Sequence, residues 1–243
     1  MKTEKLLIMS LLIASFLSGC TNMEEPVTSG TAESIEVNAG IAEATRAVIS
    51  GGYTNDLEVS FVRLDNPGTT GAQWNNPSID AVRTGGTGNT VLTFEPEQTY
   101  LAEDGESILI GYYPRKALNS GTTNPVSVTY TITGEEDIMA TGVQTGSLTD
   151  KFETFTFNHL LTQLQFKCTG SAGAIAKWTA IASIKVKNVA TGLKLSLDKT
   201  KGAQLMATGT TNQTLTVKNC PSTVSAPDAE KPSTGYLLLY PTA

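Results

Sequence analysis

Short segments with the pattern of β-strands recur along most of the chain, and this spacing constrains the fold more than any other feature. Each segment alternates apolar and polar residues or is rich in β-branched and aromatic residues, and Gly, Pro or Asn flank it. The segments cover residues 57–64, 90–94, 107–113, 125–133, 152–157, 160–168, 181–189, 193–197, 204–208, 214–218 and 235–240. Only residues 173–181 have the pattern of a short helix. The chain is therefore predicted to be all-β, with a β-sandwich architecture.

The N-terminus has the pattern of an exported lipoprotein. Two lysines precede an apolar run that ends at Leu17, and the run is shorter than the about 20 residues that a membrane-spanning helix needs. The sequence Leu17-Ser18-Gly19-Cys20 is similar to a bacterial lipobox, so residues 1–19 are predicted to be a signal peptide and Cys20 to carry a diacylglyceryl group. The alternative is an ordinary signal peptide that contains a cysteine. Two or more acyl chains anchor a protein stably, so lipidation would tether the chain to a membrane.

A further strand-like segment lies between Cys20 and Arg46. The four apolar residues that alternate along it, with period two, are Ile35, Val37, Ala39 and Ile41. This alternation predicts a half-buried strand, whereas the preceding Thr-, Ser- and Gly-rich stretch is typical of a flexible tether. Thr45-Arg46-Ala47 follows the strand. The residues alone leave open whether Arg46 is a protease site or an unremarkable linker residue.

Charge and composition argue against several functional classes. The chain has 17 Lys and Arg against 23 Asp and Glu, a formal net charge of −6 and no basic stretch, which argues against a nucleic-acid partner. The single histidine, His159, lies between two apolar strands and is predicted to be structural. Residues 84–89 are Gly-rich but lack the lysine of a phosphate loop, so they are interpreted as a flexible turn. The acidic residues 135–137 are interpreted as a solvated turn. No enzyme activity, metal or cofactor is expected, because hydrolase and metalloprotease motifs are missing from the sequence.

Two cysteines besides Cys20 leave the disulfide pattern open. Cys168 and Cys220 can pair in the oxidising conditions that exported proteins meet. The alternative is two buried, unpaired thiols on neighbouring strands.

The order of these signals resembles the fimbrillin family, which comprises lipoprotein-derived subunits of type V pili and related surface adhesins. Besides the lipobox and Thr45-Arg46-Ala47, the resemblance rests on three segments. They are Ile108-Leu109-Ile110-Gly111-Tyr112-Tyr113-Pro114, Tyr236-Leu237-Leu238-Leu239-Tyr240-Pro241, and the stretch from Phe155 to Phe166, which matches the family signature F-x-F-x-H-x-x-x-x-L-x-F.

The resemblance implies two tandem transthyretin-like β-sandwich domains, expected here at residues 47–150 and 151–243. They would follow the signal peptide and a lipidated propeptide at residues 20–46. An arginine-specific protease would cut between Arg46 and Ala47 and remove the strand of Ile35, Val37, Ala39 and Ile41. The exposed groove would then accept a strand of another subunit. The protein would be a structural, tip or accessory subunit of a pilus, held at the outer membrane through Cys20 and moved into the fimbrium after processing.

Two expectations depart from this scheme. The chain stops at Ala243, where the family usually continues for several strands, so the C-terminal domain is expected to be incomplete. A truncated product, a short paralogue, or a subunit that accepts a strand without donating one would each explain this. The alternative function is a non-polymerising outer-membrane lipoprotein adhesin that binds glycans or host ligands. Trp74, in an expected loop, would then be a stacking platform for sugars rather than a partly buried anchor.

Overall fold

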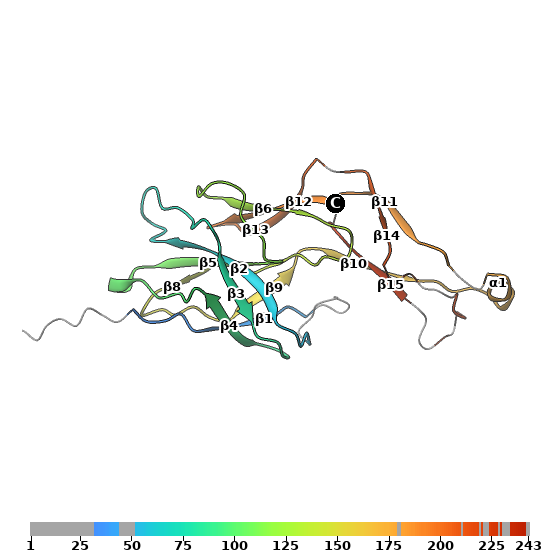
Figure 1. Cartoon of the computed structure of the whole chain (residues 1–243), viewed down its shortest axis with the longest axis horizontal. Coiled ribbons are helices and arrows are strands. Elements are labelled where there is room, and N and C mark those ends of the chain that lie inside the picture. Colours follow the sequence, from blue (N-terminus) through green and yellow to red (C-terminus); the bar gives the residue numbers. More distant parts are fainter. Residues whose placement is uncertain are drawn as a thin grey trace, which may run out of the picture. The chain divides into compact units, whose positions relative to one another are not determined.

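The computed structural model describes residues 32–43, 52–178, 181–209, 211–218, 220, 224–227, 229 and 234–241. These residues form a nearly all-β structure (Figure 1). The strands are β1 (Val37–Ile41), β2 (Leu57–Asp65), β3 (Ile79–Arg83), β4 (Thr90–Glu95), β5 (Ser107–Tyr113), β6 (Val126–Thr131), β7 (Met139–Ala140), β8 (Gln144–Gly146), β9 (Phe155–His159), β10 (Thr162–Lys167), β11 (Lys185–Val189), β12 (Gly192–Asp198), β13 (Gly202–Ala207), β14 (Gln213–Thr216) and β15 (Thr234–Leu239). A short 3-10 helix, η1 (Ala102–Asp104), and one α-helix, α1 (Ala172–Lys177), complete the described elements.

The largest sheet closes on itself. Its strand order is β2-β3-β4-β1-β9-β7-β5, and β5 pairs again with β2. The short strand β8 pairs with the first part of β5, and β7 with its last part. Because a closed sheet leaves no free edge strand, each strand of this ring has a neighbour on both sides.

Aromatic side chains fill the inside of the ring. Phe61 of β2 contacts three other phenylalanines edge to face, with ring centroids 5.2 Å from Phe94, 5.0 Å from Phe155 and 6.1 Å from Phe157. These geometries are the favoured ones for aromatic pairs. The phenylalanines come from β2, β4 and β9, so the core joins segments almost 100 residues apart in the sequence.

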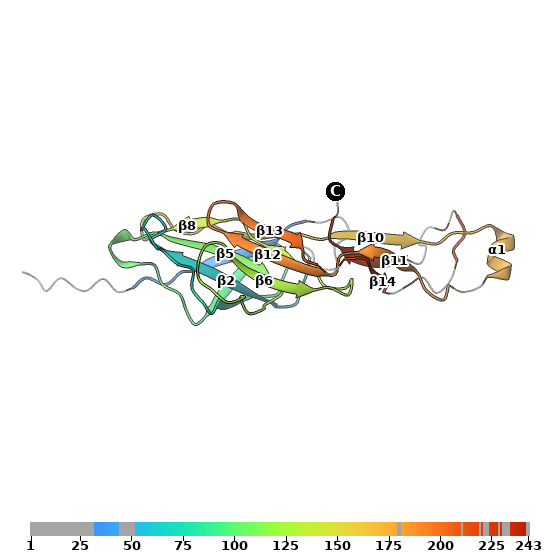
Figure 2. The same cartoon turned by 90° about the horizontal axis from the view of Figure 1, so that it is seen from above.

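A second sheet covers the outer face of β2 and β5. It has the order β13-β12-β6, and Figures 1 and 2 show it lying over these two strands. Val62 and Ile110 of the ring belong to the same buried cluster as Val128 and Leu195 of this sheet. Strand β5 is therefore buried on both faces, which explains its continuous apolar sequence.

Two smaller strand pairs follow in the C-terminal part of the chain. β10 pairs with β15, and β11 with β14, all antiparallel. Leu215, Val217 and Leu237 form a separate small cluster there. Counting only residues that the structure describes, this cluster contains fewer buried residues than the two described above.

Each predicted strand segment overlaps an observed strand, and the helix expected at residues 173–181 is observed as α1. The prediction missed β3, β7 and β8. The last two contain only two and three residues, too few for a periodic pattern. Strands from both sides of the expected boundary at residues 142–151 pair with each other, since β9 pairs with β1 and β12 pairs with β6. The division at residue 150 and the transthyretin-like topology stay predictions.

Candidate functional site

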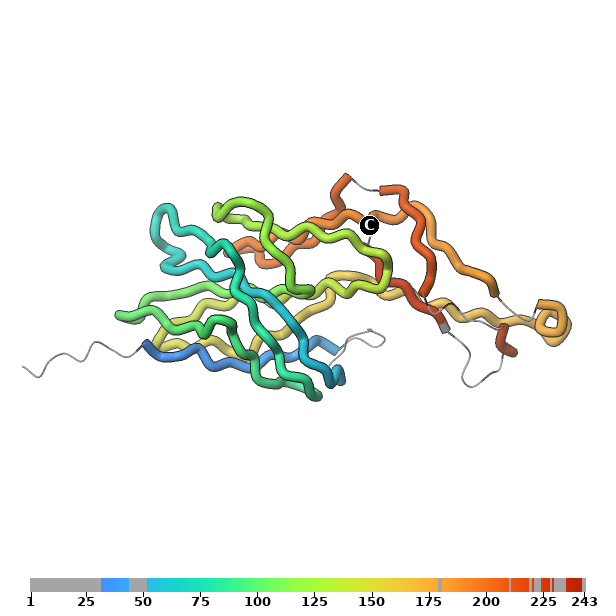
Figure 3. Tube along the Cα trace, in the orientation of Figure 1, coloured from blue at the N-terminus to red at the C-terminus, as the bar shows by residue number. Residues whose placement is uncertain are grey.

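Strand β1 lies inside the ring sheet between partners that are distant in the sequence. It is antiparallel to β4, with Val37 opposite Leu92, and parallel to β9, with Ile41 opposite Phe157. Figure 3 shows this trace, with blue β1 running beside yellow β9. Ala39 belongs to both ladders. It is the last residue paired with β4 and the first paired with β9. We call the place that β1 occupies between β4 and β9 the β1 slot.

Backbone hydrogen bonds extend beyond β1 at both ends. The Ile35 amide donates to the Gln98 carbonyl at 2.8 Å, and the Ala42 amide donates to the Phe157 carbonyl at 2.9 Å. Upstream, the Tyr100 amide donates to the Glu33 carbonyl at 2.9 Å. The segment from residue 33 to residue 42 is therefore bonded to the ring along its whole length.

The burial of this segment follows the alternation in the sequence. Ile35, Val37, Ala39 and Ile41 are between 0% and 8% exposed and belong to the ring core, whereas Glu36 and Asn38 are exposed. The predicted burial of the four apolar residues is thus confirmed. Burying a large aliphatic side chain contributes about 1.5–3 kcal/mol, so the segment contributes several kcal/mol to the ring.

A buried arginine bonds to the middle of β1. Arg83, the last residue of β3, is fully buried and points into the ring. Its Nε donates to the Ala39 carbonyl at 3.1 Å, and its Nη2 donates to the carbonyls of Gly86 and Gly88 at 2.9 and 2.7 Å. Among the described residues, all its hydrogen-bond partners are backbone carbonyls, Thr84 included. Burial lowers the pKa of Arg83, but an arginine stays protonated in proteins. The site therefore places a positive charge against the backbone of β1.

The Gly-rich segment at residues 84–89 shapes this arginine site. Gly86 and Gly88 have φ angles of 141° and 71°, in the region that glycine tolerates best. A Cβ atom on Gly85 would lie 2.0 Å from the Thr54 carbonyl oxygen. The sequence predicted only a flexible turn here and did not indicate that its carbonyls hold Arg83. The signal in the sequence was a glycine cluster directly after an arginine, and it becomes informative only once Arg83 is known to be buried.

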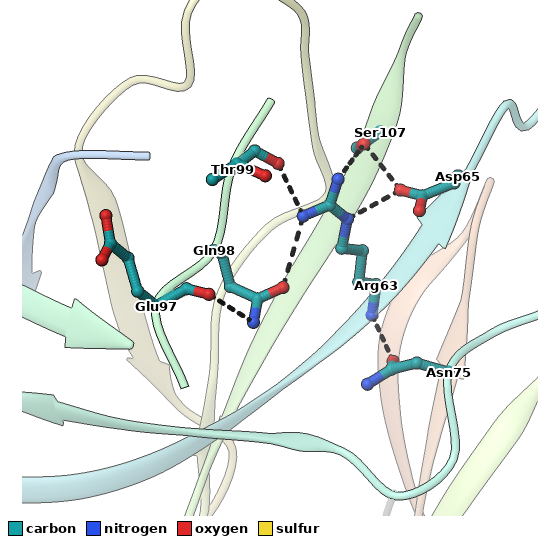
Figure 4. A network of polar contacts seen from close by, with 7 residues as sticks. All are labelled: Arg63, Asp65, Asn75, Glu97, Gln98, Thr99 and Ser107. Atoms are coloured by element: carbon teal, nitrogen blue, oxygen red, sulfur yellow. Dashed lines mark hydrogen bonds and ion pairs between the residues drawn. The ribbon is translucent and has the colours of Figure 1, made fainter. Parts of the chain in front are cut away.

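A polar network around Arg63 holds residues 98–100, to which the start of the β1 segment is hydrogen-bonded. The Arg63 guanidinium donates to the Thr99 carbonyl at 2.9 Å and to the side chains of Asp65 and Ser107 at 2.7 and 3.1 Å (Figure 4). Its Nη1 also lies 3.3 Å from the Gln98 side-chain oxygen. Residues 98–100 are the ones that bond to residues 33–35, so this network orients the backbone on which the segment begins.

The C-terminal end of the segment lies near a buried ion pair. His159 Nδ1 is 2.8 Å from Asp137 Oδ2, and this hydrogen bond raises the pKa of His159. The structural role predicted for the histidine agrees with this contact. The solvated turn predicted for residues 135–137 is wrong for Asp137, which is only 3% exposed. Glu136 instead accepts hydrogen bonds from the turn backbone, among them the Thr133 amide at 2.6 Å.

Several predicted site residues lie outside the described part of the chain. Cys20, Arg46 and Ala47 are among them, so lipidation and processing remain predictions. Cys168 and Cys220 are both free, half-buried thiols in the structure, and a disulfide between them stays a prediction.

Trp74 is buried, with 1% of its surface exposed, and its indole Nε1 donates to Asn124 Oδ1 at 2.9 Å. The hypothesis of a sugar-stacking platform is therefore wrong, because neither ring face is open. Within the described ranges, no three His, Cys, Asp or Glu residues gather as a metal site would require. No helix among those residues has the length and apolar character to cross a membrane.

Comparison with known proteins identifies a family that matches most of the chain. Residues 45–242 match the model of the fimbrillin-like family. No curated protein matches the sequence. A proposed cell adhesion protein from Bacteroides uniformis ATCC 8492 has a similar structure, with a TM-score of 0.59, 16% identity, and coverage of 89% of this chain and 76% of the other.

Two further solved structures show the same fold. One is a proposed cell adhesion protein from Bacteroides ovatus ATCC 8483, with a TM-score of 0.53, 20% identity, and coverage of 87% and 79% of the two chains. The other is a fimbrial protein from Bacteroides vulgatus ATCC 8482, with a TM-score of 0.50, 11% identity, and coverage of 85% and 77%.

Proposed function

Because the chain belongs to the fimbrillin-like family, we propose that it is a non-enzymatic subunit of a cell-surface pilus that assembles by strand exchange. The observation that supports this most is the position of β1. The strand completes a closed ring, the segment from Ile35 to Ile41 buries four apolar side chains, and Thr45-Arg46-Ala47 follows within a few residues.

Removal of β1 would turn a closed sheet into an acceptor. β4 and β9 would each lose a neighbour, and the Phe61 cluster would lose part of its cover. An unpaired edge beside an apolar core binds an added strand through backbone hydrogen bonds, while alternate side chains fill the core. A strand of another subunit can then replace β1.

The proposed pathway assigns a role to each N-terminal segment. Residues 1–19 direct export, Cys20 carries the lipid that holds the precursor at the outer membrane, and residues 20–46 keep the β1 slot filled. An arginine-specific protease cuts after Arg46, and the match to the fimbrillin-like family begins beside this site, at Thr45. The subunit then leaves the membrane anchor and joins the fimbrium.

Mass spectrometry of surface-sheared material tests this pathway. The mature protein is expected to begin at Ala47 and to occur in polymers, and Arg46→Ala is expected to leave the protein as a lipidated monomer. Cys20→Ser is expected to give an unacylated precursor.

A second candidate is the non-polymerising lipoprotein adhesin. The similarity to two proposed cell adhesion proteins favours keeping it. Mature surface protein that still begins at Cys20 and remains monomeric would support this candidate and contradict strand exchange.

A further inference from the structure

Most of the hydrogen bonds that hold the Arg83 guanidinium come from its own turn and not from β1. Three of its carbonyl partners, Thr84, Gly86 and Gly88, belong to the turn that directly follows it. Among the residues that the structure describes, Arg83 has one partner outside this turn, the Ala39 carbonyl in β1, which accepts from Nε. When β1 leaves, the turn still holds the guanidinium, and its Nε–H loses its acceptor. A strand that covered the slot without an acceptor would bury this charged donor unpaired, which is costly, so the slot favours a strand that presents a carbonyl there.

The bonded carbonyl also marks a special position of the strand. Ala39 is the residue at which β1 changes its pairing from β4 to β9. Its side chain is fully buried beside Phe155, its register partner, which is also fully buried. The ring centroids of Phe61 and Phe155 are 5.0 Å apart, so the space beside Phe155 suits a small side chain such as that of Ala39. A shift of one residue would turn the wrong set of side chains into the core and would move the carbonyl away from Arg83.

From this geometry we propose that Arg83 sets the register of the strand that occupies the β1 slot. It does so by hydrogen bonding to the main-chain carbonyl of one small residue. The incoming strand belongs to a second subunit and places apolar residues at the positions of Ile35, Val37 and Ile41, with a small residue at the position of Ala39. The inference rests on the strand exchange proposed above and names the residue that selects the partner strand.

Peptide competition on protein nicked after Arg46 tests this role. The peptides span Ser34–Ala42 and differ in a single backbone bond. An ester between residues 39 and 40 makes the Ala39 carbonyl a poorer acceptor and also removes the Gly40 N–H. An ester between residues 37 and 38, which removes the Asn38 N–H, serves as the control. Each peptide competes with the bound propeptide on wild-type protein and on Arg83→Met, so the two proteins form a double-mutant cycle with the peptides.

The 39–40 ester is expected to weaken binding to wild-type protein by about tenfold, at the lower end of the effect of losing a hydrogen bond to a charged group. On Arg83→Met it should weaken binding clearly less, because only the loss of the Gly40 N–H remains. Equal losses for the 39–40 ester on both proteins would overturn the role of Arg83 and leave strand exchange standing. If no peptide competes on wild-type protein, strand exchange and the role of Arg83 both fail.

The cycle does not depend on one variant. If Arg83→Met does not fold, Arg83→Lys replaces it, because lysine keeps the charge but has no Nε–H donor at this place. On wild-type protein alone, the 39–40 ester must weaken binding more than the 37–38 ester does. Equal effects at these two positions would contradict the proposal without any protein variant.

Discussion

Ala39 has the smallest side chain on the inward face of β1, and the neighbouring Phe155 explains why. Both residues are fully buried and lie side by side, as register partners on the neighbouring strands β1 and β9. Overpacking a well-filled core costs about 1–3 kcal/mol, so Ala39→Leu should lower the free energy of unfolding by about that amount. Asn38→Leu is the control, because Asn38 is exposed and surface changes stay within about 0.5 kcal/mol. Urea denaturation measures both. Equal stability of the two variants would contradict the packing described for β1.

His159 gives the ring a pH-dependent contribution. Its hydrogen bond to Asp137 raises the pKa of the imidazole above the ordinary value of 6.5. A raised pKa means that the folded state binds the proton more tightly than the unfolded state does. The contribution is therefore complete below pH 6.5 and disappears as the pH rises through the raised pKa.

The corresponding variant is His159→Gln. Wild-type protein should lose stability as the pH rises above 6.5, and His159→Gln should lack this part of the pH dependence. Thermal denaturation across this range provides the measurement. Parallel pH profiles for the two proteins would show that the pair does not contribute in this way.

Among the elements, the sequence predicted those strands whose apolar residues follow a clear pattern. β1 and β2 alternate, and β5 is continuously apolar because both of its faces are buried. β3 was missed because it is short and a charged residue, Arg83, takes an inward position where the alternation predicts an apolar one. The inward position of Arg83 depends on the turn at residues 84–89 and on Ala39, and no local pattern contains that information. The β1 segment of the candidate site was thus predictable, whereas its contact with a buried arginine was not.

The turn after β3 should be sensitive to side-chain volume. Gly85→Ala would place a methyl group 2.0 Å from the Thr54 carbonyl, so the backbone must shift. We expect a loss of about 2 kcal/mol or more in the free energy of unfolding, with faster amide exchange in β1. Gly68→Ala is the matched control, because its Cβ would meet no atom within 4 Å. Unchanged amide exchange in β1 for Gly85→Ala would separate the turn from the β1 slot.

For the whole molecule, long-range pairing decides the arrangement that sequence patterns leave open. The sequence predicted a β-rich chain and an N-terminal strand with a buried face. It did not predict that β1 closes a ring between β4 and β9, since neither partner is a sequence neighbour of β1. Trp74 shows the same limit. Its loop position suggested an exposed platform, but Asn124, just before β6, accepts a hydrogen bond from the indole, and Trp74 belongs to the buried cluster shared with the second sheet.

The central claim is that β1 is a replaceable strand of the ring, and the melting temperature of the cut protein tests it most directly. The protein is cut after Arg46, freed of residues 20–46, and melted with and without a peptide spanning Ser34–Ala42. The peptide should raise the melting temperature, because the four buried side chains contribute several kcal/mol. A peptide with Ile35→Asp and Val37→Asp should have no effect, whereas one with Glu36→Lys should act like the wild type, since Glu36 is exposed. An unchanged melting temperature with the wild-type peptide would contradict the account.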